Sequence, residues 1–448
     1  MSVLRDLAAF VYGASVEALP EAERALQRRH VADTLLAAAV GAWTEEGRQL
    51  RYLLPKASIA DAAGMAAAVV RHTEIDDIHT PSCTTPSSVT VPTTLALARA
   101  GETSDQERVA SAIWVGTELL VRLGVAIDGA RILYRGIWPT YFAAPLAGAA
   151  IAARMGSLSE EQTAHALSLA LMLTAGRSGR FQGQLPGRSV ILGMAVSAGV
   201  QAAQAARQGV GGDPNLLDGS WLREAHGLEA DLGALTVNLG RGSVYTQLSL
   251  KPFCSAKQAV AATEALMTLI DEGLTPAAID KVTVRVPPPY ARMVSTRPEA
   301  GSRSSTIVSA AYQLGLAALR RERLYDIERA SAMQDADVLA FADKVTVVPD
   351  EGLLPDFPAS FPAEIEVSAK GTLHRRRVTA ALGDPSRQLE DAQLKEKADR
   401  VFEQAGATRP GSHLLELGLA GLHDRDSCRA LADAMWNALA GADLLFAK

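Results

Sequence analysis

Residues 71–92, RHTEIDDIHTPSCTTPSSVTVP, hold most of the groups in this chain that could do chemistry. The segment contains two adjacent carboxylates, two histidines and a run of threonine and serine hydroxyls, and it lies between long apolar stretches. Titratable side chains gathered in an otherwise apolar context are typical of a polar pocket that binds or transforms a small molecule. The sequence therefore predicts that this segment contributes to the functional site.

Asp76, Asp77 and His79 are the candidates of this segment for proton transfer, and Glu74 is a third carboxylate close to them in sequence. Dehydration, decarboxylation or epimerisation beside a carboxylate requires an acid or base for a carbon-bound proton, together with fixed positive charge for the developing enolate. If the carboxylates face one another, like-charge repulsion should raise at least one carboxylate pKa. Adjacent residues on a strand or helix point in different directions, so we expect one member of the Asp76–Asp77 pair to face the pocket.

Each of these residues also has a structural interpretation. His72 can hydrogen-bond a helix terminus, because buried polar groups need partners. Asp76 and Asp77 can form a helix cap or a turn, which is the commoner role of such a pair taken alone. The chemical interpretation therefore needs support from the rest of the chain.

The elements that must hold this segment are mainly helices. From residue 1 to about residue 250, apolar residues recur at spacings of three and four, and many runs are apolar nearly all round, which predicts helices buried on several sides. After about residue 255 the pattern changes to alternating strands, as in Val282, Val284 and Val286, with Lys370–Gly371 as a hairpin turn. Helical periodicity returns from about residue 392 to the end.

We therefore predict a mainly α protein with a smaller α+β domain. The helical domain comprises residues 1–255 and 392–448, so that both ends of the chain build it, and residues 256–391 form the α+β domain. The C-terminal helices are expected to pack back on the first helical segment.

The segment at 71–92 resembles a motif of the MmgE/PrpD family, which includes 2-methylcitrate dehydratases, cis-aconitate decarboxylases and iminodisuccinate epimerases. A histidine, an acidic residue and an Asp-Asp pair are followed by a hydroxyl-rich turn, by Pro-Ser and by Val-x-Pro leading into an apolar helix. The matching residues are His72, Glu74, Asp76, Asp77, Pro86, Ser87, Val91 and Pro92.

Four further segments resemble the family, in the same order along the chain. RGIWPT has Trp138 where a histidine is common, and GQLPGRSVILGMA has Arg188 where the family brings a lysine to the pocket. KPFCSAKQAV keeps Lys251 of the domain junction, followed by Lys257 rather than by a histidine, and TIVSAAYQLGLAAL maps the family's pocket tyrosine onto Tyr312. Five motifs in the family's order indicate kinship over most of the chain.

The resemblance implies a large all-helical domain formed from both chain ends, a smaller inserted α/β lid, catalysis without a cofactor, and a homodimer. Together with the residue types, it makes Asp76, Asp77, His79, Lys251 and Tyr312 the catalytic candidates. The residues expected to bind the substrate are His72, Glu74, Thr84, Thr85, Trp138, Arg188 and Lys257.

Three cations are available for an anionic substrate. Arg188, Lys251 and Lys257 could hold both oxygens of a carboxylate in a site that the lid closes. Without the resemblance, Arg188 would be interpreted as a surface residue after a glycine-containing loop. Lys251 and Lys257 would be interpreted as residues on the exposed side of the helix that follows them. Tyr312 would then be a core residue with its hydroxyl hydrogen-bonded.

A metal site is weighed because His72, Asp76, Asp77 and His79 have suitable ligand atoms, and the spacing places His72 and Asp76 on one helical face. No second ligand cluster follows, and the cysteines are misplaced for an iron–sulfur cluster. Nucleotide-binding fingerprints are also missing, since no phosphate-binding loop occurs and GRFQGQLPG lacks the strand-glycine-helix context. We expect no metal and no cofactor.

Composition excludes several classes of partner. The chain has 448 residues with 44 basic and 50 acidic side chains, so its net charge of -6 gives no basic surface for nucleic acid or an anionic membrane. Its three scattered cysteines argue against a disulfide framework and a thiolate zinc site. The N-terminus lacks a signal-peptide pattern, and we expect no segment long enough to span a membrane. A reducing cytoplasm is the predicted location.

The chain departs from the family at three histidines. Thr84 and Thr85 occupy the stretch where the lyases have a histidine before Pro-Ser, Trp138 replaces a second, and a third is missing after Lys251. A threonine hydroxyl cannot replace an imidazole as a general acid near neutral pH, so classical dehydration of 2-methylcitrate is in doubt.

Three functional hypotheses follow. The first is a cofactor-independent lyase, of dehydratase or decarboxylase type, that acts on a small di- or tricarboxylate. The second is an epimerase or isomerase of an aspartate- or succinate-like dicarboxylate, which needs only proton abstraction and return. The third is a helical binding protein without catalytic activity.

Overall fold

Alanine-rich helices that are apolar on several sides build the larger part of the computed structural model. The structure describes residues 2–52, 58–103, 105–174, 187–299, 302–329, 332–422 and 425–440. Every residue of α8 except Arg154 is buried, and α8 packs between α6 and α10. The helices of this part up to residue 250 are α1 (Val3–Gly13), α2 (Glu21–Trp43), α3 (Glu45–Arg51), α4 (Ile59–Arg71), α5 (Ser87–Arg99), α6 (Gln106–Ala126), α7 (Gly129–Ile132), α8 (Pro139–Met155), α9 (Glu160–Met172), α10 (Gly187–Arg207), α11 (Trp221–His226) and α12 (Gly233–Thr236).

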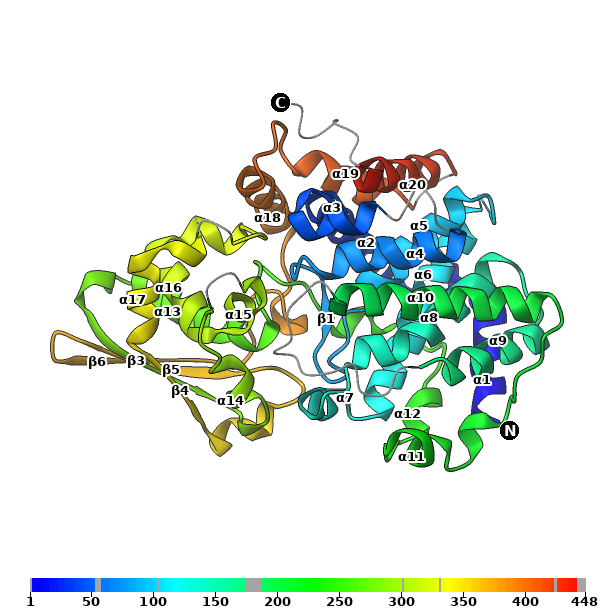
Figure 1. Cartoon of the computed structure of the whole chain (residues 1–448), viewed down its shortest axis with the longest axis horizontal. Helices are drawn as coiled ribbons and strands as arrows, with labels where there is room; N and C mark the ends of the chain where they lie inside the picture. Colours follow the sequence, from blue (N-terminus) through cyan, green and yellow to red (C-terminus); the bar gives the residue numbers. More distant parts are fainter. Residues whose placement is uncertain are drawn as a thin grey trace.

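The C-terminal helices return to this helical part, as predicted. α19 packs against α2, and α20 packs against both α2 and α5, so the red C-terminal helices lie beside the blue helices α2 and α3 in Figure 1. Inside this contact, the buried ammonium of Lys397 on α18 forms an ion pair with Asp33 on α2 at 2.5 Å. The bounds are α18 (Asp391–Gln404), α19 (Ser412–Ala420) and α20 (Arg425–Ala440).

The region between these segments carries a four-stranded mixed sheet, which lies beside the helical part in Figure 1. Its order is β4-β3-β5-β6, with β3 parallel to β4 and the other neighbours antiparallel. The elements are α13 (Lys257–Asp271), β3 (Ile279–Val286), α14 (Pro288–Val294), α15 (Arg303–Val308), α16 (Ala310–Leu319), α17 (Ala336–Asp343), β4 (Val345–Pro349), β5 (Ala363–Ala369) and β6 (Thr372–Val378).

The strand predictions are confirmed in this sheet. Val282, Val284 and Val286 are buried on one face of β3, and α13 contacts β5 and β6. Lys370 and Gly371 form the two-residue turn between β5 and β6, and both have positive φ angles, of 48° and 78°. Positive φ at both turn positions matches the right-handed twist of the strands. The predicted domain boundaries at residues 255 and 391 stay a prediction.

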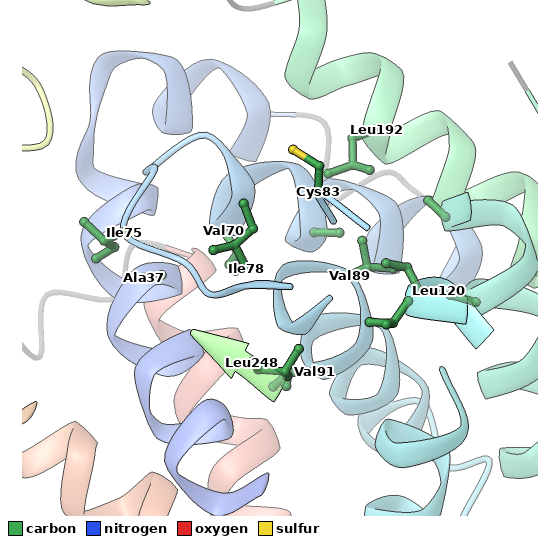
Figure 2. Close-up of a cluster of buried hydrophobic side chains, with 14 of the residues drawn as sticks. Ala37, Val70, Ile75, Ile78, Cys83, Val89, Val91, Leu120, Leu192 and Leu248 are labelled. Atoms are coloured by element: carbon green, nitrogen blue, oxygen red, sulfur yellow. The ribbon is translucent and has the colours of Figure 1, made fainter. Parts of the chain in front are cut away.

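A second, very short ribbon connects the candidate segment to the residues before the sheet region. β1 (Ile78–His79) pairs antiparallel with β2 (Leu248–Ser249), with Ile78 opposite Ser249. Figure 2 shows a cluster of buried apolar side chains that includes Ile78 and Leu248 of this ribbon. The others labelled come from α2, α4, α5, α6, α10 and the segment after α4, and include Ala37, Val70, Ile75, Val89, Val91, Leu120 and Leu192.

Two helices correct the expectation that no segment reaches the length of a membrane span. α6 and α10 are each long and apolar enough to cross a membrane, judged by length and composition alone. Of their most apolar windows, 89% and 61% lie buried inside the protein. Helices that are covered on several sides reach this hydropathy as part of a core.

The crossing of α4 and α10 generates a prediction, because it depends on two glycines. A Cβ added to Gly64 would lie 2.1 Å from the carbonyl oxygen of Gly193. We expect Gly64→Ala to force the two helices apart and to lower the free energy of unfolding by about 2 kcal/mol, measured by urea denaturation. Gly13→Ala is the control, since nothing lies within 4 Å of its added Cβ. Equal stability of the two variants would contradict this account.

Candidate active site

The residues after α4 leave the helix abruptly and place the Glu74 side chain in a buried charge network. Glu74 has a φ angle of 61°, which is uncommon for a residue other than glycine. Remote side chains donate hydrogen bonds to the carbonyls of residues 72–75: Arg303 to the first two at 2.9 and 3.0 Å, Lys251 to the third at 3.2 Å and Lys397 to the fourth at 2.9 Å. Three cations from different parts of the chain therefore fix this turn.

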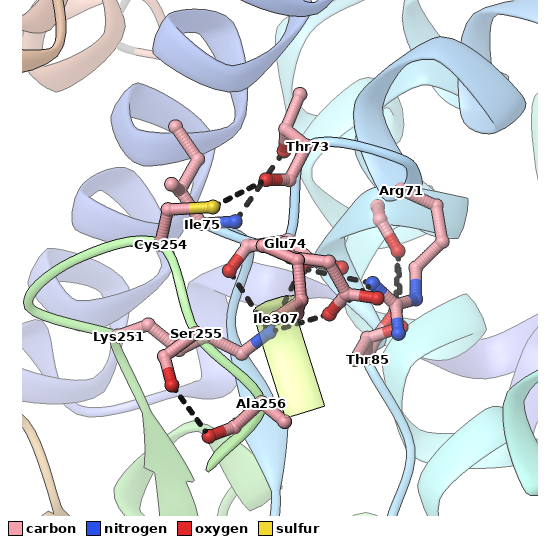
Figure 3. A network of polar contacts seen from close by, with 12 residues as sticks. Arg71, Thr73, Glu74, Ile75, Thr85, Lys251, Cys254, Ser255, Ala256 and Ile307 are labelled. Atoms are coloured by element: carbon pink, nitrogen blue, oxygen red, sulfur yellow. Dashed lines mark hydrogen bonds and ion pairs between the residues drawn. The ribbon is translucent and has the colours of Figure 1, made fainter. Parts of the chain in front are cut away.

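Glu74 lies among three cations, as Figure 3 shows in part. Its carboxylate is 2.9 Å from Arg71 Nη1, 2.6 Å from Arg188 Nη2 and 3.1 Å from Lys251 Nζ. Burial acts to raise the pKa of Glu74, but Arg71, Lys251 and Arg188 outweigh burial and hold that pKa well below its ordinary value. Glu74 is therefore ionised at neutral pH.

Asp76 also contacts Arg71 and Lys251, but the pKa of Asp76 is raised, whereas that of Glu74 is lowered. Asp76 Oδ1 accepts hydrogen bonds from Arg71 Nη1 and Lys251 Nζ, each at 3.3 Å. Its buried Oδ2 has no hydrogen-bond partner among the described residues. Burial is the main cause that raises the pKa of Asp76, and the charges of Glu74 and Asp77 add to it. The raised pKa was expected, but burial rather than like-charge repulsion is its largest cause.

Asp77 points away from this network and has the structural role that its type suggests. Its carboxylate accepts hydrogen bonds from the backbone N–H of Ser87, at 3.1 Å, and from the Ser87 hydroxyl, and it lies 2.8 Å from His30 Nδ1. Because Ser87 begins α5, Asp77 caps that helix. The two adjacent aspartates therefore have different roles: Asp76 belongs to the charge network, and Asp77 caps the start of α5.

The two histidines of the segment are held by other groups. His72 lies with Nδ1 2.9 Å from Glu46 and with Nε2 2.8 Å from Thr44, the residue that caps α3. His79 lies 2.9 Å from the Ser82 hydroxyl, and burial lowers the pKa of His79 to about 4, so its ring is neutral. The expectation that His72 and Asp76 share a helical face is wrong, because α4 ends at Arg71.

A cavity of about 70 Å³ opens beside Glu74, between the helical part and the sheet region. Several predicted residues line it, and so do Arg71, Thr140, Tyr141 and Gln258, polar residues that sequence reasoning missed. Asp76, Asp77, His72, His79, Thr84 and Tyr312 are not among the lining residues. The predicted residues that line it are Glu74, Thr85, Trp138, Arg188, Lys251 and Lys257.

Aromatic rings support the arginine side of the cavity. The guanidinium of Arg188 lies over the Trp138 ring, 4.4 Å from its centroid, and Trp138 stacks on Tyr141 with 5.3 Å between centroids. A planar guanidinium gains cation–π energy in this position and is held in one orientation. Trp138, which stands where the family commonly has a histidine, therefore positions a cation instead of offering a proton.

Lys257 and Tyr312 have surroundings that differ from those expected. Lys257 lines the cavity, but its ammonium lies 2.5 Å from the buried carboxylate of Asp384 and its charge is neutralised there. Tyr312 lies on α16, outside the cavity lining, and burial raises its pKa to about 12. Val308, from the same motif, is the residue that reaches the cavity.

Arg71 and Tyr141 were missed for different reasons. Arg71 is the first residue of the informative segment and precedes His72 directly, so its position was a usable signal. Tyr141 follows the Trp138-Pro139-Thr140 motif within α8, where an aromatic residue in an apolar run predicts core packing. Within the described ranges, no group of three or more His, Cys, Asp or Glu side chains is arranged to hold a metal ion.

The architecture defines a two-part protein, with a large helical part and a smaller mixed-sheet part, whose buried cations and carboxylates gather at the junction. Comparison with family models identifies it more closely. The MmgE/PrpD N-terminal domain matches residues 5–228 and the MmgE/PrpD C-terminal domain matches residues 253–417. The chain therefore belongs to the MmgE/PrpD family, which consists largely of enzymes and includes dehydratases, decarboxylases and epimerases. The comparison with curated proteins gave no match.

The ion pairs of Glu74 generate a prediction on pH. Because the pKa of Glu74 is lowered on folding from an ordinary value of 4.5, its contribution to stability is complete above pH 4.5 and is lost as pH falls below that value. We expect Glu74→Gln to lower the free energy of unfolding by about 3 kcal/mol near pH 7, and the difference from the unmodified protein to shrink below pH 4.5.

Urea denaturation at a series of pH values measures this difference. Glu403→Gln, on the exposed side of α18, is the matched control and should change stability by less than about 0.5 kcal/mol at every pH. A Glu74→Gln effect that grows as pH falls would contradict the assignment of an ionised Glu74.

Proposed function

We propose that this protein is a cofactor-independent lyase, of dehydratase or decarboxylase type, that acts on a small di- or tricarboxylate. The observation that carries the proposal is the convergence of Arg71, Arg188 and Lys251 on one side of the cavity. Buried cations that line a cavity favour an anionic ligand, because charged hydrogen bonds strengthen where water is excluded.

Arg71 and Arg188 each have an N–H donor that such a ligand could accept from. Glu74 occupies Arg71 Nη1 and Arg188 Nη2, whereas Nε of Arg71 and Nε of Arg188 are buried without a hydrogen-bond partner among the described residues. Unpaired buried donors are costly, and a ligand carboxylate that accepts from them would remove that cost. A guanidinium also matches the two oxygens of a carboxylate in geometry.

We assign proton transfer to Lys251, and Asp76 is the carboxylate that exchanges a proton with Lys251. Lys251 lines the cavity, and its Nζ lies 3.1 Å from Glu74 and 3.3 Å from Asp76. The raised pKa of Asp76 allows this exchange. In dehydration, Lys251 first gives its proton to Asp76 and then, as a neutral amine, removes the proton beside the substrate carboxylate. The electron pair forms the carbon–carbon double bond, and the hydroxyl takes the proton that Lys251 now carries and leaves as water. The arginines stabilise the negative charge that develops on the substrate carboxylate.

One observation favours the epimerase as the second candidate. No histidine is among the residues that line the cavity within the described part of the chain. Expulsion of hydroxide needs a strong proton donor, whereas epimerisation needs only removal and return of a carbon-bound proton. The binding protein without activity is the third candidate, and homodimer assembly and a cytoplasmic location stay predictions.

Proton NMR in deuterium oxide separates these candidates. The purified protein is incubated with 2-methylcitrate, citrate, cis-aconitate and iminodisuccinate. Loss of a substrate with appearance of an alkene or a decarboxylated product would support the lyase. Incorporation of deuterium beside a carboxylate, with the skeleton intact, would support the epimerase instead. Saturable binding of these ligands without any chemical change would favour the binding protein.

Substitution of Lys251 tests the assigned proton transfer. We expect Lys251→Gln to lower kcat for the substrate found by NMR roughly 100-fold or more, because general acid–base groups contribute about that much. Lys251→Arg keeps the charge but cannot readily release a proton, so it should bind the substrate and remain slow. Lys395→Gln, at an exposed position of α18, should retain full activity.

Circular dichroism must show that the Lys251 variants are folded, because removing one partner of a buried ion pair also destabilises. A folded Lys251→Gln variant with undiminished kcat would show that another group transfers the proton.

A further inference from the structure

Tyr141 is a buried polar side chain at the cavity to which the mechanism above gives no role. It lies in the first turn of α8, is 1% exposed, and contributes to the cavity lining. Its ring is held by stacking on Trp138, which in turn carries the Arg188 guanidinium. The position of its hydroxyl is therefore set by packing before any ligand arrives.

The Tyr141 hydroxyl differs from the hydroxyls of Tyr245 and Tyr290, which are hydrogen-bonded inside the protein. Tyr312 also has a buried hydroxyl without a partner among the described residues, but Tyr312 does not line the cavity. Tyr245 contacts Gln27 and Thr117 at 3.2 and 3.3 Å, and Tyr290 donates to the carbonyl of Pro362 at 2.7 Å. The hydroxyl of Tyr141 has no hydrogen-bond partner in the part of the chain that the structure describes. Buried tyrosine hydroxyls usually find a partner, and the cavity is the space into which this one can donate.

The charges around Tyr141 indicate what kind of atom completes this hydrogen bond. Burial raises the pKa of Tyr141 and outweighs the charges of Arg188 and Arg71, which lower it, so the group is protonated at neutral pH and available as a donor. Nε of Arg71 and Nε of Arg188 are also buried donors without a partner among the described residues. Three donors at one cavity call for a ligand rich in acceptors, and a carboxylate with its two oxygens is such a ligand.

We infer that Tyr141 is a ligand-binding residue, whose hydroxyl donates a hydrogen bond to a carboxylate oxygen of the substrate beside the Arg71 and Arg188 guanidinium groups. This inference rests on the proposed function, since it assumes that the cavity accepts a carboxylate. A site with a fixed buried donor discriminates against a ligand that lacks the matching acceptor, because the donor is then left unpaired. Tyr141 therefore contributes to specificity as well as to affinity.

Isothermal titration calorimetry with citrate tests the role of Tyr141. Tyr141→Phe removes the hydroxyl and keeps the ring that stacks on Trp138. We expect citrate to bind this variant about 10-fold to 100-fold more weakly than the unmodified protein, as loss of one hydrogen bond to a charged group predicts. Its melting temperature should stay the same or rise, because a buried hydroxyl without a protein partner has been removed.

Tyr245→Phe is the matched control, because its hydroxyl is buried and bonded inside the helical core, away from the cavity lining. We expect this variant to lose thermal stability and to bind citrate as the unmodified protein does. Opposite effects of the two substitutions on binding and on stability would separate ligand binding from packing.

Three results would overturn the inference. If the unmodified protein binds citrate and Tyr141→Phe binds it equally well, the role of Tyr141 is refuted while the carboxylate site stands. If the unmodified protein binds neither citrate nor the other carboxylates of the NMR panel, the proposed function fails, and the role of Tyr141 fails with it. A Tyr141→Phe variant that loses binding together with thermal stability would also refute the inference in favour of a structural role.

Discussion

The rest of this structure depends on the ion pairs and hydrogen bonds that the buried ammonium of Lys251 forms. Lys251 is 1% exposed and contacts the Glu74 carbonyl, the Glu74 carboxylate and the Asp76 carboxylate. A buried charge is tolerated only when it is paired and hydrogen-bonded, so Lys251 and the turn at residues 72–76 require each other. Arg71, at the end of α4, balances the second carboxylate of the pair. The positive φ angle of Glu74 is held in place by this pairing, because the turn presents both its carbonyl and its side chain to the same ammonium.

The helical part and the sheet region meet at this network, and both contribute charged side chains to it. The helical part provides both carboxylates and two arginines, whereas Lys251 follows β2 and Arg303 begins the α15 segment of the sheet region. The C-terminal helices are also connected to it, because Lys397 on α18 binds both Asp33 and the carbonyl of residue 75. Segments from both ends and the middle of the chain thus determine the geometry of a single turn. Displacement of any one of them would alter the site, which is why the pocket cannot be assigned to one domain alone.

The chemistry of the pocket differs in character from that of a histidine-based site. Trp138 holds a guanidinium and Thr85 contacts Thr140, at positions where histidines are expected in the family. Cations and hydroxyls therefore replace imidazoles around the cavity, which favours recognition of a carboxylate and stabilisation of an enolate over protonation of a leaving hydroxyl. Under the proposed function, this site can still act on a carboxylate, but it contains fewer groups that can donate a proton to the substrate.

The sequence by itself determined the elements and the family. Helical periodicity, the alternation of Val282, Val284 and Val286 and the turn at Lys370–Gly371 depend on neighbouring residues, so they can be interpreted locally. The expectation that one member of the adjacent aspartate pair faces the pocket is not met, because neither Asp76 nor Asp77 lines the cavity. Only the tertiary structure decided that Asp76 joins the charge network, that Asp77 caps α5, and that Tyr141 rather than Tyr312 reaches the cavity. The physical reason is that side-chain direction follows from where α4 ends and from which distant cations pair with the turn, and neither is encoded in the spacing of the motif.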